Sequence, residues 1–301
     1  MTSQHMDESI YSRQSNPLII QCLFAQRRKY SQAKFISGLY FLICVIGLCV
    51  FAVLKSVTQS DIVTGLSIGL SVAALLLSFL STATTNKLKE CAASIQQYID
   101  VTLYSFPQFE KMNKKWFRPL SKNDIIEMVS KYPRKGFCAN DKWYEDYSTK
   151  GACEQIYFSQ LENIRWDRDL RRIYDIICKV IIIAIIIGVF VVALFINPTF
   201  MKMISIIPWC MPFIKYLISF WKGMKKDNER LEKLRTMANN VPDERKVSHA
   251  ETWLEREIDL QNKIYEHRKN AILIPNFFYR LCYRWQQKNE ESIARNHREE
   301  N

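Results

Sequence analysis

Apolar residues gather in four long segments, and the stretches between them carry nearly all of the charge. The first two segments, residues 35–54 and 62–83, contain no charged residue. Each is close to the ~20 residues that cross a ~30 Å hydrocarbon core as a helix. The third segment, residues 176–196, has one lysine near its start, and the fourth, residues 203–221, contains Lys215. The pattern predicts four transmembrane helices.

The distribution of lysine and arginine predicts how these helices are oriented. Basic residues precede the first and third segments and follow the second and fourth, whereas the two short connections carry only Lys55 and Lys202. By the positive-inside rule, both termini and the central segment are cytoplasmic and two tight hairpins face outward. The net charge of +12 is therefore interpreted as topology and attraction to anionic lipid headgroups. No DNA or RNA partner is expected.

We thus expect an all-α membrane protein in five parts. A cytoplasmic N-terminal segment (1–34) precedes the first transmembrane hairpin (35–83), and a helical cytoplasmic insert (84–172) precedes the second hairpin (173–221). A cytoplasmic, helical C-terminal region (222–301) completes the chain. Apolar residues at helical spacing continue the second segment outward and lead into the third, so we expect these membrane helices to extend into the cytoplasm.

The C-terminal region has its own helix signals. Residues 239–243, Asn-Asn-Val-Pro-Asp, predict a break, and Ser248 with Glu251 forms the capping-box pattern that opens a helix ending near Ala271. The predicted apolar face of this helix comprises Trp253, Leu254, Ile258, Ile264 and Tyr265.

No pattern in the chain indicates an enzyme. GxxxxGK, GxGxxG, GxSxG and HExxH are all absent from the sequence. Its nine cysteines form no CxxC, and no histidine stands at ligand spacing to a cysteine, so we expect no catalytic residue, metal site or cofactor. Asp167 and Asp169 are flanked by arginines and are interpreted as members of solvated ion pairs.

Hydroxyl residues form a narrow stripe along the second segment, beside a face that carries Gly65 and Gly69. One interpretation is that the stripe lines a water-filled path while the glycine face packs on a neighbour. The other is that the hydroxyls bond to carbonyls of their own helix or hold helices together. The pore-lining candidates of the stripe are Thr64, Ser67, Ser71 and Ser78.

Two prolines interrupt the fourth segment. Pro208 and Pro212 are one turn apart, so the carbonyls that they leave unpaired share one face, and we expect a kink with that face turned inward. Lys215 lies about 9 Å from the cytoplasmic end of the helix. It either extends to the interface or marks a pore or hinge position. Since four helices of one chain leave no room for a wide channel, any pore needs several copies.

Three stretches of the chain carry a resemblance to a known family: residues 26–34, 163–174 and 274–280. The last of them has the sequence Ile-Pro-Asn-Phe-Phe-Tyr-Arg. With two hairpins around a cytoplasmic insert, they resemble the SMODS-associated four-transmembrane effectors of bacterial antiphage systems, over nearly the whole chain. The resemblance implies a multi-pass inner-membrane protein that forms pores as a homo-oligomer. It also implies a CBASS-like setting, in which an adjacent nucleotidyltransferase makes a cyclic oligonucleotide messenger that triggers abortive infection.

A nucleotide ligand would need aromatic faces for stacking and arginines for its phosphates. The residues that supply these types are Trp166, Arg171, Tyr265, Arg268 and Tyr279. The ordinary alternative for them is helix packing and surface charge, and the aromatic run at 274–280 could instead dock on the membrane interface. For the whole protein, the alternatives are a housekeeping ion channel or transporter and a membrane-anchored scaffold.

Overall fold

The computed structural model describes residues 9–47, 50, 54, 61–131, 143–196, 200–244 and 250–299. Its secondary structure is 87% helix, and the described residues contain no strand, so the predicted all-α class is confirmed. The elements are α1 (Ile10–Arg13), α2 (Pro17–Tyr40), the π-helical turn η1 (Phe41–Ile46), α4 (Asp61–Tyr104), the 3-10 turn η2 (Pro107–Phe109), α5 (Glu110–Asn113), α6 (Lys122–Ser130), α7 (Ala152–Ile196), α8 (Phe200–Glu244), α9 (Ala250–Asn270) and α10 (Asn276–Glu299).

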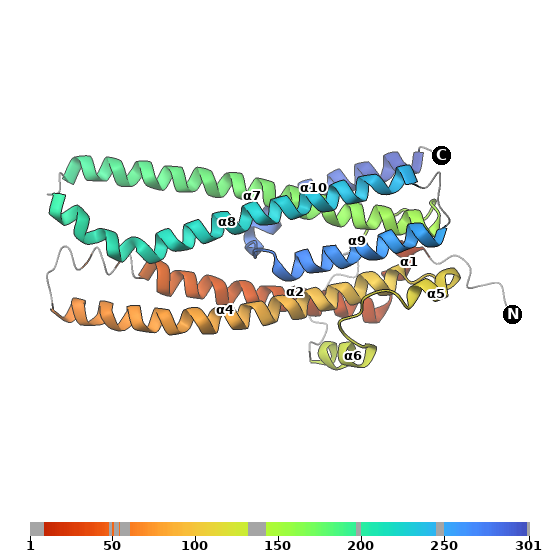
Figure 1. Cartoon of the computed structure of the whole chain (residues 1–301), viewed down its shortest axis with the longest axis horizontal. Coiled ribbons are helices and arrows are strands. Elements are labelled where there is room, and N and C mark those ends of the chain that lie inside the picture. The colour runs from red at the N-terminus through yellow and green to blue at the C-terminus, as the bar shows by residue number, and fades with distance from the viewer. Residues whose placement is uncertain are drawn as a thin grey trace.

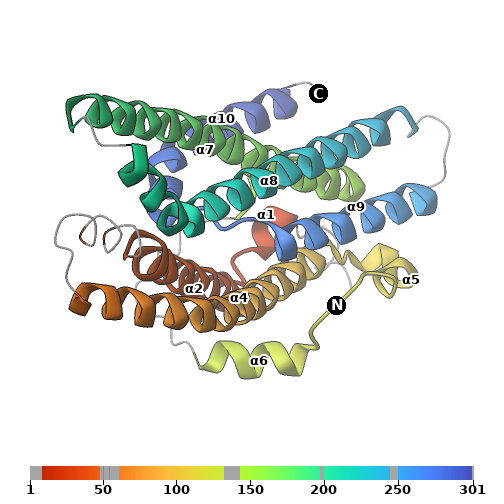
Figure 2. The ribbon, with the colours of Figure 1, turned by 60° about the vertical axis from the view of Figure 1, so that its left-hand side comes forward.

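Four helices, α2, α4, α7 and α8, run along the long axis of an elongated molecule (Figure 1). One half contains these helices alone, and the other half adds α1, α5, α6, α9 and α10 around them (Figures 1 and 2). Helices α4, α7 and α8 have 44, 45 and 45 residues. The predicted continuation of the apolar segments into long helices is therefore confirmed.

Large apolar side chains are exposed along the half that contains only the long helices. Examples are Phe35 at 69%, Ile62 at 75%, Phe79 at 68% and Ile186 at 62%. A contiguous apolar surface of this kind is uncommon on soluble monomers. Within the described ranges, α4 alone is long and apolar enough to cross a membrane by length and composition, so the four-span topology stays a prediction.

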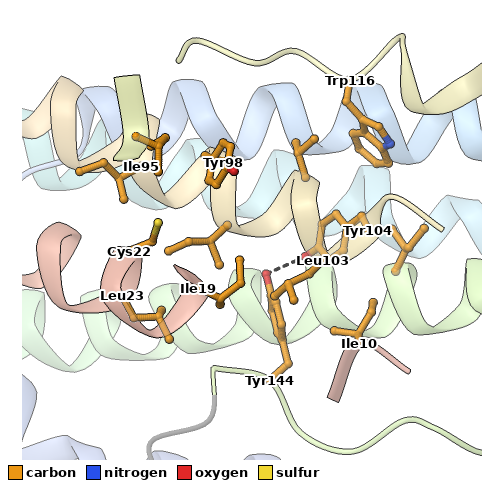
Figure 3. Close-up of a cluster of buried hydrophobic side chains, with 14 of the residues drawn as sticks. Ile10, Ile19, Cys22, Leu23, Ile95, Tyr98, Leu103, Tyr104, Trp116 and Tyr144 are labelled. Atoms are coloured by element: carbon orange, nitrogen blue, oxygen red, sulfur yellow. Dashed lines mark hydrogen bonds between the residues drawn. The ribbon is translucent and has the colours of Figure 1, made fainter. Parts of the chain in front are cut away.

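The main core lies in the other half, where α1 and α2 pack on the second part of α4 (Figure 3). Ile95, Leu103 and Tyr104 of α4 are at most 1% exposed, and the Tyr104 hydroxyl lies 2.7 Å from that of Tyr144. Each fully buried aliphatic side chain contributes about 1.5–3 kcal/mol. The core therefore holds α2, the second part of α4 and the start of α7 together beside the cavity described below.

The apolar face predicted for α9 is confirmed, because Trp253, Leu254, Ile258, Ile264 and Tyr265 are all buried. The predicted break at 239–243 is wrong, since α8 stays helical through these residues to Glu244. Pro242 stands in the last turn, where its missing amide removes only one hydrogen bond at the end of the helix. Ser248 of the predicted capping box lies outside the described residues.

Helix α8 is bent in its first part, where the ribbon changes direction in both views (Figures 1 and 2). Pro208 and Pro212 belong to this first part of a helix that begins at Phe200. Proline is the ordinary cause of a sharp kink, because its ring displaces the carbonyl one turn earlier. The bend lies in the part of α8 for which the kink was predicted, and the direction in which the kinked face turns stays a prediction.

Candidate functional site

A cavity of about 680 Å³ lies among α2, α7, α9 and α10, in the half of the molecule that holds the core. Its size is within the ~300–1,000 Å³ of ordinary ligand sites. Helix α8 contributes Leu231 and Leu234, and the linker between α9 and α10 contributes Ile272. The lining thus combines apolar residues with a set of charged and aromatic side chains.

One end of the cavity is basic and lies at the start of α10. The Lys34 ammonium donates a hydrogen bond to Asn276 Oδ1 at 2.8 Å, and Asn276 Nδ2 donates to Ser31 Oγ at 3.0 Å. Burial, and secondarily the charge of Arg171, lowers the pKa of Lys34 from 10.5 to about 8. A half-buried lysine whose nearest acceptor is a neutral amide favours an incoming anion.

Aromatic rings form the middle of the cavity wall. The ring centroids of Trp166 and Tyr283 are 5.9 Å apart, those of Trp166 and Tyr279 are 6.2 Å apart, and those of Tyr279 and Tyr283 are 6.0 Å apart. All three side chains line the cavity and are partly exposed in it. Such rings offer π-faces on which a planar group can stack.

The opposite end carries two glutamates, and Arg284 lines the cavity three residues before Gln287 on α10. Gln287 Nε2 donates to Glu145 Oε1 at 2.5 Å, and the backbone N–H of Glu145 donates to Glu162 Oε2 at 3.1 Å. Burial raises the pKa of both carboxyl groups. The pKa of Glu162 lies well above the ordinary value of a glutamate. Eleven residues of α10 separate Asn276 from Gln287, so the two ends are about 16 Å apart.

Arg171 ties three elements together beside the basic end. Its guanidinium donates to Asp167 of the same helix at 3.0 Å, to Asp227 of α8 at 3.0 Å and to the carbonyl of Ile272 at 2.9 Å. Burial alone would raise the pKa of Asp167, but Arg171 and His267 hold it below its usual range. Because the carboxylates of Asp167 and Asp227 already neutralise Arg171, it joins α7, α8 and the α9–α10 linker.

A second buried network joins α4, α7 and α9. Asp100 is fully buried and accepts hydrogen bonds from Arg268, from Tyr144 at 2.7 Å and from Gln261 at 3.0 Å. Asn163 of α7 donates to the Tyr144 hydroxyl at 2.6 Å. Burial opposes the charge on Arg268, but Asp100 outweighs it and raises the pKa of Arg268. Arg268 and Asn163 line the cavity, so the network reaches the ligand space.

A known protein family matches nearly the whole chain. A family model described as the SMODS-associating 4TM effector domain matches residues 8–299. The chain belongs to this family. No curated protein and no solved structure matches it. The family description indicates an effector of antiphage systems with a link to nucleotide second messengers, and it makes a membrane location plausible.

In this member of the SMODS-associating 4TM effectors, four of the five predicted ligand residues line one cavity. They are Trp166, Arg171, Arg268 and Tyr279. Tyr265 lies outside the lining: its hydroxyl is 3.3 Å from Ser94 Oγ, and its ring centroid is 5.4 Å from that of Phe117. The two arginines and two of the aromatic residues are thus brought together from α7, α9 and α10.

Asp167 and Asp169 form the predicted ion pairs, but the prediction that these pairs are solvated is wrong, because their side chains are largely shielded from water. Their carboxylates are 28% and 23% exposed, and their partners Arg171 and Arg168 are 8% and 13% exposed. The ion pairs exist, but α8, α9 and the linker contact the face of α7 that carries Asp167 and Arg171. A polar face of α7 is thus partly covered by α8 and α9 through polar contacts.

The pore candidates are placed only in part. Thr64, Ser67 and Ser71 belong to α4, and Pro208 and Pro212 to α8, but the side chains of these residues lie outside the described part. Lys215 is exposed on α8. Ser78 is half-buried one turn after Ala74, which packs against Tyr40 and Leu70. Both interpretations of the stripe stay open.

The glycine face of α4 packs on nothing within the described chain. A Cβ atom added at Gly65 or Gly69 would meet no heavy atom within 4 Å. The neighbour expected for this face is therefore not supplied by the part of the chain that the structure describes.

Sequence reasoning missed Lys34, Tyr283, Glu145 and Glu162 as lining residues. One signal was present: Tyr279-Arg280 and Tyr283-Arg284 repeat the same pair at a spacing of four, which places both tyrosines on one helix face. The two glutamates gave no signal, because the contact between residues 145, 162 and 287 is purely tertiary.

Proposed function

We propose that the protein is a pore-forming effector of the bacterial inner membrane that acts without catalysis. Four helices cross the membrane as two hairpins, both termini are cytoplasmic, and several copies assemble to permeabilise the bilayer. The exposed apolar side chains of α2, α4, α7 and α8 support this placement, because contact of such a large apolar surface with water costs free energy that contact with lipid does not. The outcome is abortive infection in a CBASS-like system.

A cyclic oligonucleotide messenger occupies the cavity in this proposal. Lys34 faces its phosphates, and Trp166, Tyr279 and Tyr283 stack on its bases. Glu145 and Glu162 accept hydrogen bonds from exocyclic amino groups, which are the donors on base edges. The order of basic, aromatic and acidic groups along α10 is the observation that supports this ligand class.

The cavity is connected to the apolar half by continuous helices. Helices α2, α7 and α8 each contribute to its lining and then run on into the half where apolar side chains are exposed. A messenger phosphate beside Arg171 competes with Asp227 for the guanidinium, and this would loosen α8 from α7. The ligand thereby biases the arrangement of the membrane helices, which is the physical requirement for gating.

The test measures binding and permeability separately. Full-length protein in detergent is titrated with a panel of cyclic di- and trinucleotides, and a membrane-impermeant dye is followed in cells that make the same nucleotides. Y279L and Y283L remove the stacking faces and should weaken binding, by about 1–3 kcal/mol for each stacked base. F117L, an exposed aromatic residue outside the cavity, is the matched control.

Two results would count against the proposal in different ways. Dye exclusion that persists while a nucleotide is bound would remove the pore. Dye entry that is the same with and without every nucleotide of the panel, and in both tyrosine variants, would remove activation through the cavity.

A further inference from the structure

Helix α10 has an exposed apolar stripe that the proposed function does not use. Outside the four apolar segments, the described chain exposes few large apolar side chains, namely Phe117, Ile126, Phe277, Leu281 and Trp285. Phe277 at 71%, Leu281 at 73% and Trp285 at 54% are spaced by four residues and therefore lie on one side of α10. The opposite side of the same turns lines the cavity with Tyr279 and Tyr283.

A basic row flanks the apolar stripe. Arg280, Arg284 and Lys288 are exposed at the same spacing of four, each three residues after a member of the stripe. Arg280 and Arg284 stand between the two sides of the helix, because they also belong to the lining of the cavity. No carboxylate of the described residues lies within 4.0 Å of Arg280 or Arg284. Beyond Lys288 the exposed side chains of α10 are polar or charged, for example Ser292 and Asn296. The combination of apolar and basic rows is thus confined to residues 277–288 of the helix.

This half of α10 lies at the base of two apolar segments. Asn276 is hydrogen-bonded to Lys34, which is followed by the exposed Phe35, and the ring centroid of Phe278 lies 4.9 Å from that of Tyr174, two residues before the third segment. Leu281 and Trp285 follow about one and two turns further along, at ~6 and ~12 Å from Phe277. In Figure 1, α10 begins near the middle of the long axis and runs beside α7.

We propose that the first half of α10 contacts anionic lipid headgroups, with the apolar stripe in the interface and the basic row on phosphate groups. Phe277 lies nearest the hydrocarbon and Trp285 farthest from it, at the level where tryptophan is favoured. Lysine and arginine stems reach back toward the headgroups, each adding about 1 kcal/mol at an anionic surface. The inference rests on the membrane placement in the proposed function.

A second copy of the chain is a poorer occupant of this surface. A symmetric contact would bring Arg280, Arg284 and Lys288 of two copies against each other, which is repulsive. The remaining exposed apolar residues of the aqueous half are Phe117, in the loop between α5 and α6, and Ile126 of α6, and they form no matching stripe.

The test reads tryptophan quenching by lipids that are brominated near the top of their acyl chains. Full-length protein is reconstituted in nanodiscs of phosphatidylglycerol or phosphatidylcholine, and the signal of Trp285 is the difference between wild type and W285F. We expect quenching in phosphatidylglycerol that falls about twofold or more when R280Q, R284Q and K288Q are combined. R295Q, exposed on the polar half of the same helix, should leave it unchanged.

Trp221, 52% exposed at the end of the fourth apolar segment, is the internal reference, and its signal comes from W221F. Quenching of Trp221 without quenching of Trp285 overturns the α10 contact and leaves the membrane placement intact. Loss of both signals overturns the membrane placement as well. Cross-linking of L281C between copies, with Trp285 unquenched, would assign the stripe to a second copy and overturn the lipid contact.

Discussion

Lys34 and Arg171 line the same cavity, but their surroundings give them different roles. Arg171 is bonded to two carboxylates and a backbone carbonyl, so its charge is already compensated. The Lys34 ammonium has an amide oxygen as its acceptor, and it lies near Arg171, which repels it. An anion that enters the cavity is therefore expected to gain more from Lys34 than from Arg171.

The pKa of Lys34 can be tested by chemical labelling. Since only the neutral amine reacts with an anhydride, labelling of Lys34 should rise through a midpoint near pH 8, below the ordinary 10.5. The measurement is competitive labelling of the detergent-solubilised protein with peptide mass spectrometry. D167N removes a carboxylate that favours the protonated form, so it should move the midpoint lower still. A midpoint near that of free lysine, ~10.4, would contradict the buried position.

The buried pair of Asp100 and Arg268 predicts a strong, non-additive mutational effect. R268M leaves a fully buried carboxylate without its counter-ion, and such losses cost about 3–5 kcal/mol of unfolding free energy. In the double variant D100N and R268M, the loss should be smaller than the sum of the single losses, because the unpaired charge is gone. Denaturant unfolding in detergent measures all three. A loss in the double variant that equals the sum of the two single losses would mean that Asp100 and Arg268 are not coupled.

At the scale of elements, the linker after α9 is held by a close contact with α8. Gly223 faces Ile272, whose Cδ1 would clash with a Cβ atom at position 223. G223A should therefore destabilise the packing of α8 on the linker, although alanine is the better helix former. I272V removes the crowding Cδ1 atom and should recover roughly 1 kcal/mol in the double variant.

Thermal unfolding of the single and double variants measures this contact. G188A is the matched control, because a Cβ atom there meets nothing within 4 Å and the substitution should be neutral or stabilising. If G223A behaves like G188A, α8 and the linker do not approach each other as closely as the structure shows.

Sequence periodicity predicted the elements better than their surroundings. The apolar face of α9 and the continuation of the apolar segments into α4 and α7 follow from helical spacing, which is a local property. The polar faces were misjudged: Asp167 was interpreted as solvated, yet its carboxylate is 28% exposed, and Glu162, which gave no signal in sequence, is buried. Burial of polar residues depends on which helices meet, and no pattern within one segment records that.

At the scale of the whole molecule, the half with exposed apolar side chains leaves helix surface uncovered in the part of the chain that the structure describes. Gly65 and Gly69 face open space, and Ala74 with Ser78 marks the side of α4 that meets α2. Of the stripe candidates, the structure describes the side chain of Ser78, one turn after Ala74. Four helices arranged in this way have contacts left for a neighbouring copy.

The proposed pore therefore predicts a steep dependence on the number of copies. If one chain cannot enclose a water-filled path, dye release from liposomes should rise faster than linearly with the density of reconstituted protein, at a fixed nucleotide concentration. Vesicles that contain both wild type and S71L, a variant in the hydroxyl stripe, should lose a larger fraction of their dye release than the fraction of S71L in the protein. The reason is that one defective copy inactivates the whole assembly. V72L, at an exposed apolar position beside it, is the control for added bulk. Release that is linear in density, and that falls only in proportion to the S71L fraction, would mean that each chain permeabilises the membrane alone.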